Sequence, residues 1–264
     1  MIFRTVLTDD LCKIQNLICA SFDSSLHPYM VSTQHGAEHY LRVFVEYANF
    51  HQDRYLLLAE SESNDLLGFA DFRVLDGGIG FLSYICVTEI ARGQGIAKRL
   101  ISRCLAHFPE IHTVQLDVFE DNHAAKSLYR RLGFEEGSHS VWFVRSCPVI
   151  STRKINITDI RFENLPLSLA NFEKYGFCEL SGFFYGRKIK FGRLGENVLR
   201  CFQPEDYEDD VLLAEVRYVF PAISEVFTIV SMDSTIGKTI ETRKIVHSIR
   251  MNWEILDNTF RRTQ

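Results

Sequence analysis

Two glycines, Gly93 and Gly95, stand between a strand-like run and an amphipathic stretch that reads as a helix. The first N–H groups of a helix have no partner within the helix and carry a partial positive charge, so they attract anions. Glycines just before such a helix let a phosphate approach the backbone closely, and Arg92 and Lys98 add positive charge. These residues predict an anion site; the alternative is a tight turn that holds no ligand.

The pattern around these glycines excludes two common kinds of phosphate site. The run Gly93-x-Gly95-x-x-Lys98 lacks the third glycine of a dinucleotide fingerprint, and it lacks the Gly-Lys-Ser/Thr of a triphosphate loop. The hairpin signal Asp76-Gly77-Gly78 also places the preceding strand in an antiparallel pair, whereas a doubly wound dinucleotide domain would begin with that strand and continue in parallel.

A second chemically distinctive group follows about 25 residues later. Asn122, Ala125 and Tyr129 stand at i, i+3 and i+7 and therefore share one face of a helix. That face offers an amide, a small residue for clearance and a phenol. The alternative is that Asn122 is simply a helix N-cap and Tyr129 simply a core aromatic residue.

Four elements must position these groups. The pattern predicts a strand ending near Thr88, a helix over about 95–108, a strand over about 112–118 and a helix from Asn122 to Gly133. A helical crossover joins the two strands, so we expect them to be parallel. Gly133 is expected to end its helix in the left-handed conformation.

Together these motifs resemble the GNAT superfamily of acetyl-CoA-dependent N-acetyltransferases. The resemblance covers about residues 2–146, and it rests on Arg92-Gly93-Gln94-Gly95-Ile96-Ala97 and on Asn122-x-x-Ala125-x-x-Leu128-Tyr129-x-x-x-Gly133-Phe134. It implies an α/β (α+β) fold with a mixed, mostly antiparallel sheet that is splayed and flanked by helices.

The resemblance also implies a cofactor, a reaction and site residues. Acetyl-CoA is the expected co-substrate, without a metal, and the expected acceptor is a primary amine of a small molecule or peptide. Tyr129 is the expected general acid, which protonates the leaving thiolate after direct attack through a tetrahedral intermediate. The residues expected to bind the cofactor are Ile85, Cys86, Val87, Arg92, Gly93, Gln94, Gly95, Ile96, Ala97, Lys98 and Asn122.

The general base is left open. Many relatives use a carboxylate on the splayed strand, but Phe81 to Thr88 contains neither a carboxylate nor a histidine. The candidates are Asp71, Asp117, Tyr84 or a chain of water molecules, and His27, His35 and His39 lie where the acceptor pocket is expected. Cys86 suggests an acyl-enzyme, or it is a small core residue.

Composition limits the class of protein. The 264 residues carry a net charge of −5, all of it before residue 148, which argues against nucleic-acid binding and suits a cationic substrate. Seven scattered cysteines without metal-ligand spacing fit a reducing, cytoplasmic location. We see no signal peptide and no apolar run long enough to cross a membrane.

We predict two domains, an acetyltransferase-like domain over 1–147 and a smaller α+β domain over 148–264. In the latter, 151–163 resembles a strand, 211–231 is ambiguous between helix and strand, and about 240–262 resembles a helix. The run Asn171–Phe177 resembles Leu128–Phe134, which hints at duplication.

The second domain could cap the acceptor pocket, mediate homodimerisation or bind a partner. Arg187, Lys188, Lys190 and Arg193 form a candidate anionic contact or a solvated strand face. The acidic run from Glu205 to Asp210 is expected to cap and solvate a helix. The alternative function for the whole chain is an acyl-CoA-binding sensor or interaction module with little catalysis.

Overall fold

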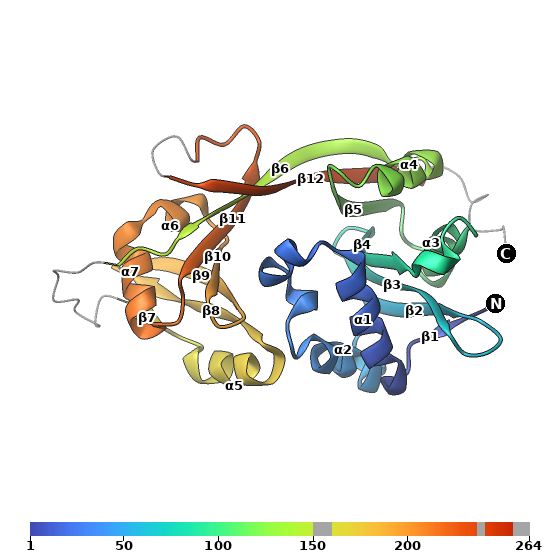
Figure 1. The fold of residues 1–264 in the computed structure, drawn as a ribbon, viewed down its shortest axis with the longest axis horizontal. Helices are drawn as coiled ribbons and strands as arrows, with labels where there is room; N and C mark the ends of the chain where they lie inside the picture. Colours follow the sequence, from blue (N-terminus) through green and yellow to red (C-terminus); the bar gives the residue numbers. More distant parts are fainter. Residues whose placement is uncertain (150–159, 237–240, 256–264) are drawn as a thin grey trace. The chain divides into compact units, whose positions relative to one another are not determined.

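The computed structural model describes residues 1–149, 160–236 and 241–255, and it divides into two compact units (Figure 1). The first unit comprises Met1–Asp23, Tyr40–His139 and the described residues from Ser248 onward. The second comprises Ser24–His39 and the described part of Ser140–His247. Each unit therefore draws on both halves of the sequence.

The first unit is a sheet with helices on both faces. Its strands lie in the order β1-β2-β3-β4-β5-β12, and neighbours are antiparallel except for the parallel pair β4–β5. The strands are β1 (Ile2–Thr5), β2 (Arg54–Glu60), β3 (Leu66–Leu75), β4 (Ile79–Val87), β5 (Thr113–Phe119) and the later part of β12 (Arg243–Glu254). The helices are α1 (Leu11–Ser21), the part of α2 (Ala37–Glu46) from Tyr40 onward, α3 (Ile96–His107) and α4 (His123–Leu132).

The alternation of side chains along β2 shows how two cores form on one sheet. Leu56 and Leu58 pack with α1 and α2, whereas Leu57 and Ala59 pack with α3 and α4. Successive strand residues point to opposite faces, so a continuous apolar run such as this one is typical of a strand buried on both sides. The predicted mixed, mostly antiparallel sheet flanked by helices is confirmed.

Strands β4 and β5 separate part of the way along their length. They pair from Ile79–Thr113 to Leu82–Leu116, yet β4 continues to Val87. The separation begins at a β-bulge, because Phe72 of β3 pairs with Leu82 while Asp71 pairs with Tyr84, which leaves Ser83 as the extra residue. A bulge bends its strand and increases the twist. The expected splay is therefore present and has a local cause.

The second unit repeats this strand arrangement. Its strands lie in the order β7-β8-β9-β10-β11-β6, again with one parallel pair, β10–β11, in the corresponding place. The strands are β6 (Glu135–Ser146), β7 (Ile160–Phe162), β8 (Phe177–Phe184), β9 (Arg187–Leu194), β10 (Val198–Cys201) and β11 (Glu225–Ser231). The helices are α5 (Leu165–Tyr175), α6 (Pro204–Glu208) and α7 (Asp210–Val219).

The compact units differ from the ranges 1–147 and 148–264 that the sequence suggested. The final strand of each unit comes from the other half of the chain: β12 pairs with β5 in the first unit, and β6 pairs with β11 in the second. Ser24–His39 also belongs to the second unit, where Tyr29 packs on Phe227. No linker composition marks these exchanges, so the sequence could not indicate them.

The helix predicted over about 240–262 is wrong for the residues that the structure describes there. Residues Arg243–Glu254 form β12, in which Ile249, Met251 and Trp253 are buried and alternate with more polar residues. The ambiguous stretch 211–231 contains most of α7 and then β11. Of the strand-like stretch 151–163, Ile160–Phe162 forms β7, and 151–159 lies outside the described residues.

Candidate functional site

The turn before α3 presents backbone N–H groups to open space. Gly93 and Gly95 have φ of 78° and 72°, a conformation that side-chain-bearing residues rarely adopt. A Cβ added at either glycine would meet nothing within 4 Å. Gly95 is the N-cap of α3, so the first amides of this helix face the same region. The sequence predicted this geometry, and it is suited to an anion.

Helix α4 holds its two candidate residues in different ways. Asn122 is the N-cap, and its Oδ1 accepts a hydrogen bond from the Ala125 N–H at 3.1 Å. Its side-chain NH2 group is then the part of the amide suited to donate to a ligand. Tyr129 is 6% exposed and belongs to the core of the first unit. Gly133 ends the helix in the left-handed conformation, as predicted.

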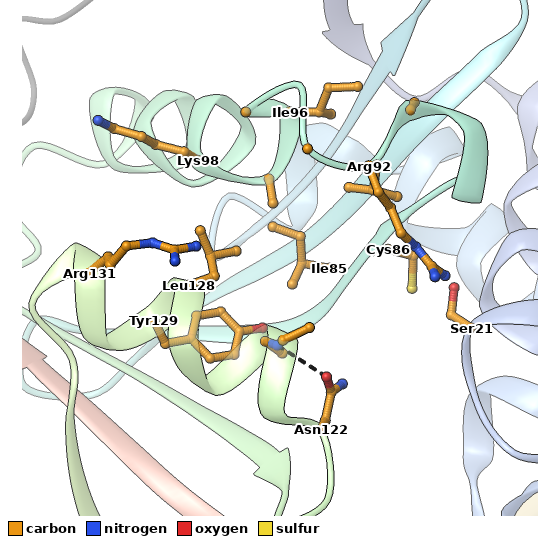
Figure 2. Close-up of a pocket in the computed structure, with 17 residues that line it drawn as sticks. Ser21, Ile85, Cys86, Arg92, Ile96, Lys98, Asn122, Leu128, Tyr129 and Arg131 are labelled. Carbon is orange, nitrogen blue, oxygen red and sulfur yellow. Dashed lines mark hydrogen bonds between the residues drawn. The ribbon is translucent and has the colours of Figure 1, made fainter.

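These elements enclose a cleft of about 560 Å³ between β4, the start of α3 and α4 (Figure 2). Every residue predicted for the site lines it except Gln94, whose side-chain amide donates to the Ile90 carbonyl at 3.3 Å. In Figure 2 the Tyr129 hydroxyl points toward the start of α4, near Asn122. The cleft borders both faces of β4, because Ile85 and Val87 pack with the α3 side and Cys86 with the α1 side.

Sequence reasoning missed some residues that line the cleft. Arg131 lies in the last turn of α4, and Ser21 lies on α1, far away in sequence. Figure 2 shows Lys98 and Arg131 at one end of the cleft, and Ser21 and Cys86 with Arg92 at the other. Arg131 stands three residues after Leu128, which also lines the cleft, and this spacing could have indicated its place. Nothing in the sequence links Ser21 to β4.

Burial controls the ionisation of the two reactive groups in the cleft. It raises the pKa of the Tyr129 phenol well above its usual value, and the nearby Cys86 adds to this effect. Burial raises the pKa of the Cys86 thiol to about 11, although Ser21 and Arg92 act in the opposite direction. Both groups therefore keep their protons at neutral pH, which suits Tyr129 for proton donation and makes Cys86 a poor nucleophile.

The candidate carboxylate bases are held by arginines. Asp71 is 1% exposed and accepts hydrogen bonds from Nε and Nη2 of Arg54 at 2.9 and 2.5 Å. Asp117 accepts from Nε and Nη2 of Arg250 at 2.5 and 2.9 Å. Neither carboxylate lines the cleft, and each is engaged by a guanidinium group.

The histidines considered for the acceptor pocket do not belong to the unit that contains the cleft. His27, His35 and His39 are part of Ser24–His39 in the second unit. His35 lies against Gly176 there, since a Cβ built on that glycine would come within 2.5 Å of the ring. None of the three lines the cleft.

Comparison with known protein families gives a match over part of the chain. Residues 17–134 match the model of the Acetyltransferase (GNAT) family, and the chain therefore carries a GNAT acetyltransferase domain. Members of this family transfer acetyl groups and use acetyl-CoA. No curated protein matches the sequence significantly.

Two solved structures extend the likeness to nearly the whole chain. A GCN5-related N-acetyltransferase from Sphaerobacter thermophilus is 14% identical with a TM-score of 0.61, and covers 96% of this chain and 95% of its own. A tandem GNAT protein from the clavulanic acid biosynthesis pathway is 12% identical with a TM-score of 0.66, over 96% and 98%. At these identities the likeness concerns the fold, and it agrees with the repeated strand order of the two units.

The described residues contain neither a cluster of metal ligands nor a membrane-spanning helix. No group of three or more His, Cys, Asp and Glu side chains is arranged to hold a metal ion there. In the same part of the chain, no helix has both the length and the apolar character needed to cross a membrane.

Proposed function

We propose that the first unit transfers the acetyl group of acetyl-CoA to a primary amine of a small molecule or peptide. The observation that carries this proposal is the single cleft in which the left-handed glycines before α3 and the buried phenol of Tyr129 meet. An acyltransferase needs both features, because one holds the cofactor and the other completes the departure of its thiol.

The chain offers a matched set of groups for coenzyme A. The amides of residues 92–98 are assigned to the diphosphate, supported by the cations Arg92, Lys98 and Arg131. The backbone of Ile85, Cys86 and Val87 beyond the bulge is assigned to the pantetheine arm, since this stretch has no pairing with β5. The Asn122 side-chain NH2 can donate to a carbonyl of the arm.

The proposed reaction is a direct attack. The amine nitrogen forms a bond to the acetyl carbon, and the tetrahedral intermediate then breaks the carbon–sulfur bond. Tyr129 gives its proton to the departing sulfur and is reprotonated from solvent. The amine loses its proton to water, because Asp71 and Asp117 are engaged with arginines. Cys86 is given no covalent role, since its raised pKa keeps the thiol protonated.

The test measures thiol release from acetyl-CoA with a panel of amines, for the wild type and for Tyr129→Phe. We expect kcat to fall by about a hundredfold or more with little change in the KM for acetyl-CoA, because general acid catalysis contributes on this scale. Tyr47→Phe is the matched control, since Tyr47 is 54% exposed and does not line the cleft. An unchanged kcat in Tyr129→Phe would remove Tyr129 from the mechanism.

The alternative is a sensor that binds acyl-CoA without turnover. The specific feature in its favour is the lack of a carboxylate on β4 between Phe81 and Val87. Coenzyme binding together with no thiol release across the whole panel would establish it over the enzyme.

A further inference from the structure

Three aromatic rings gather where β4 and β5 have separated. Phe22 lies 6.1 Å from Tyr84 and 6.1 Å from Phe119 between ring centroids, with interplanar angles of 84° and 86°. Edge-to-face contacts of this kind are the favourable arrangement for aromatic rings. All three residues are half-buried, so the group, which we call the aromatic cluster, is only partly covered.

The local structure explains why the rings meet. Phe22 is the C-cap of α1, with extended φ and ψ of −124° and 149° that direct the chain away from the helix. Tyr84 follows the bulge at Ser83 and lies on the α1 side of β4. Phe119 is the last residue of β5. Each ring therefore comes from the end or the bend of an element that borders the separation of the strands.

Each member of the aromatic cluster is connected through the backbone to a residue that lines the cleft, although the rings themselves do not line it. Phe22 directly follows Ser21, and Tyr84 directly precedes Ile85, and both neighbours line the cleft. The Phe119 carbonyl accepts the Asn122 N–H at 3.0 Å, and Asn122 also lines the cleft. The rings thus stand beside the part of β4 and α4 assigned to the reacting groups.

The two carboxylates nearest the aromatic cluster on the sheet are not available to a polycation, whereas Asp23, Glu120 and Asp121, beside it in sequence, are exposed. Asp71 is paired opposite Tyr84 on β3, and Asp117 lies two residues before Phe119 on the same face of β5. Both carboxylates are held by arginines, Arg54 and Arg250. Neither Asp71 nor Asp117 therefore offers an unpaired negative charge to a chain of ammonium groups. Arg92 adds positive charge to the cleft.

We propose that the aromatic cluster binds an apolar, aliphatic or aromatic, substituent of the acceptor amine, so that the acceptors are monoamines rather than polyamines. This inference rests on the proposed function and adds the substrate class. Aromatic walls bury apolar groups well and tolerate a single ammonium at a ring face, whereas a second and third ammonium would each need its own partner.

The experiment compares phenethylamine, spermidine and glutamate as acceptors for wild type, Phe119→Ala, Phe119→Leu and Phe22→Ala. We expect wild type to prefer phenethylamine, and each alanine variant to raise its KM by about tenfold, which is the scale of one aromatic contact. Phe119→Leu should recover part of the loss. Phe50→Ala, which changes an 83% exposed ring, is the control and should match wild type.

A binding measurement keeps the inference independent of turnover. Calorimetry of phenethylamine against the CoA-saturated protein should show binding that Phe119→Ala and Phe22→Ala weaken. A preference for spermidine or glutamate, an unchanged phenethylamine KM in folded alanine variants, or no phenethylamine binding to the CoA complex would each overturn it. Failure of CoA itself to bind would instead overturn the proposed function.

Discussion

Tyr129 reaches the cleft from within the core of the first unit. It packs against Phe134 with ring centroids 5.5 Å apart, and only 6% of it is exposed. A buried phenol resists ionisation because the charged form would lose its hydration. The burial of Tyr129 therefore accounts for its low acidity.

This burial gives a prediction for the pH dependence of kcat. An ordinary tyrosine loses its proton near pH 10, and Tyr129, with its raised pKa, should keep it beyond that value. We expect no fall of kcat from pH 8 to pH 10 in stopped thiol-release assays. A fall of kcat with a midpoint below pH 10 that disappears in Tyr129→Phe would show that the phenol is more acidic than its burial implies.

Asn122 both caps α4 and lines the cleft, so it affects the stability of the helix as well as the proposed cofactor site. Asn122→Ala should lose about 1 kcal/mol of stability, the usual cost of losing an N-cap. Asn122→Asp keeps an oxygen for the Ala125 N–H and should keep that stability. Both variants lose the NH2 donor, so both should weaken CoA binding by about threefold to tenfold.

Thermal unfolding and calorimetric titration of the two variants separate these roles. If Asn122→Asp is as stable as the wild type and binds CoA equally well, the side-chain NH2 makes no contact with the cofactor. Asn122 would then be a cap alone.

At the scale of elements, the sequence predicted the turns and helix ends that depend on a few neighbouring residues. Three local features could be predicted because each needs a particular residue type at one backbone position. They are the turn of Gly93 and Gly95, the Asn122 cap and the left-handed Gly133. β12 was missed because its alternation of Ile249, Met251 and Trp253 with polar residues is short and competes with a helical interpretation. Its pairing with β5 depends on a contact more than a hundred residues away.

The run Asn171–Phe177 shows how a local signal can mislead. It shares with Leu128–Phe134 a helix that ends at a left-handed glycine, Gly176 or Gly133, and continues into a strand. In the strand order, however, β7 and β8 correspond to β1 and β2. Helix α5 joins β7 to β8, so it corresponds to the segment between β1 and β2 and not to α4. The resemblance therefore reflects a common way to end a helix, while the repeat of the two units appears in their topology.

At the scale of the molecule, the exchange of final strands predicts that residues 1–147 do not fold alone. That fragment lacks β12, which contributes Ile249, Met251 and Trp253 to the core of the first unit. Removing several large core side chains costs more than the stability of a typical domain. We expect the fragment to show no cooperative transition by circular dichroism, and a sharp transition would contradict the exchange.

The second unit lacks the features that make the first unit's turn suitable for phosphate. Its corresponding turn, between β10 and α6, contains Pro204, which has no N–H, followed by Glu205 and Asp206. Asp206 is fully buried and paired with Arg187, which also contacts Asp209, the N-cap of α7. Arg187 is therefore engaged within its own unit, and the carboxylates there would repel a diphosphate. We expect one coenzyme per chain.

The most direct measurement is a calorimetric titration of CoA into wild type, Gly95→Glu and Gly95→Ala. Both variants impose the same left-handed backbone on a side chain, but only glutamate puts bulk and negative charge where the diphosphate is placed. We expect one site per chain, retained in Gly95→Ala and weakened at least tenfold further in Gly95→Glu. Equal CoA affinity in the two variants would contradict it.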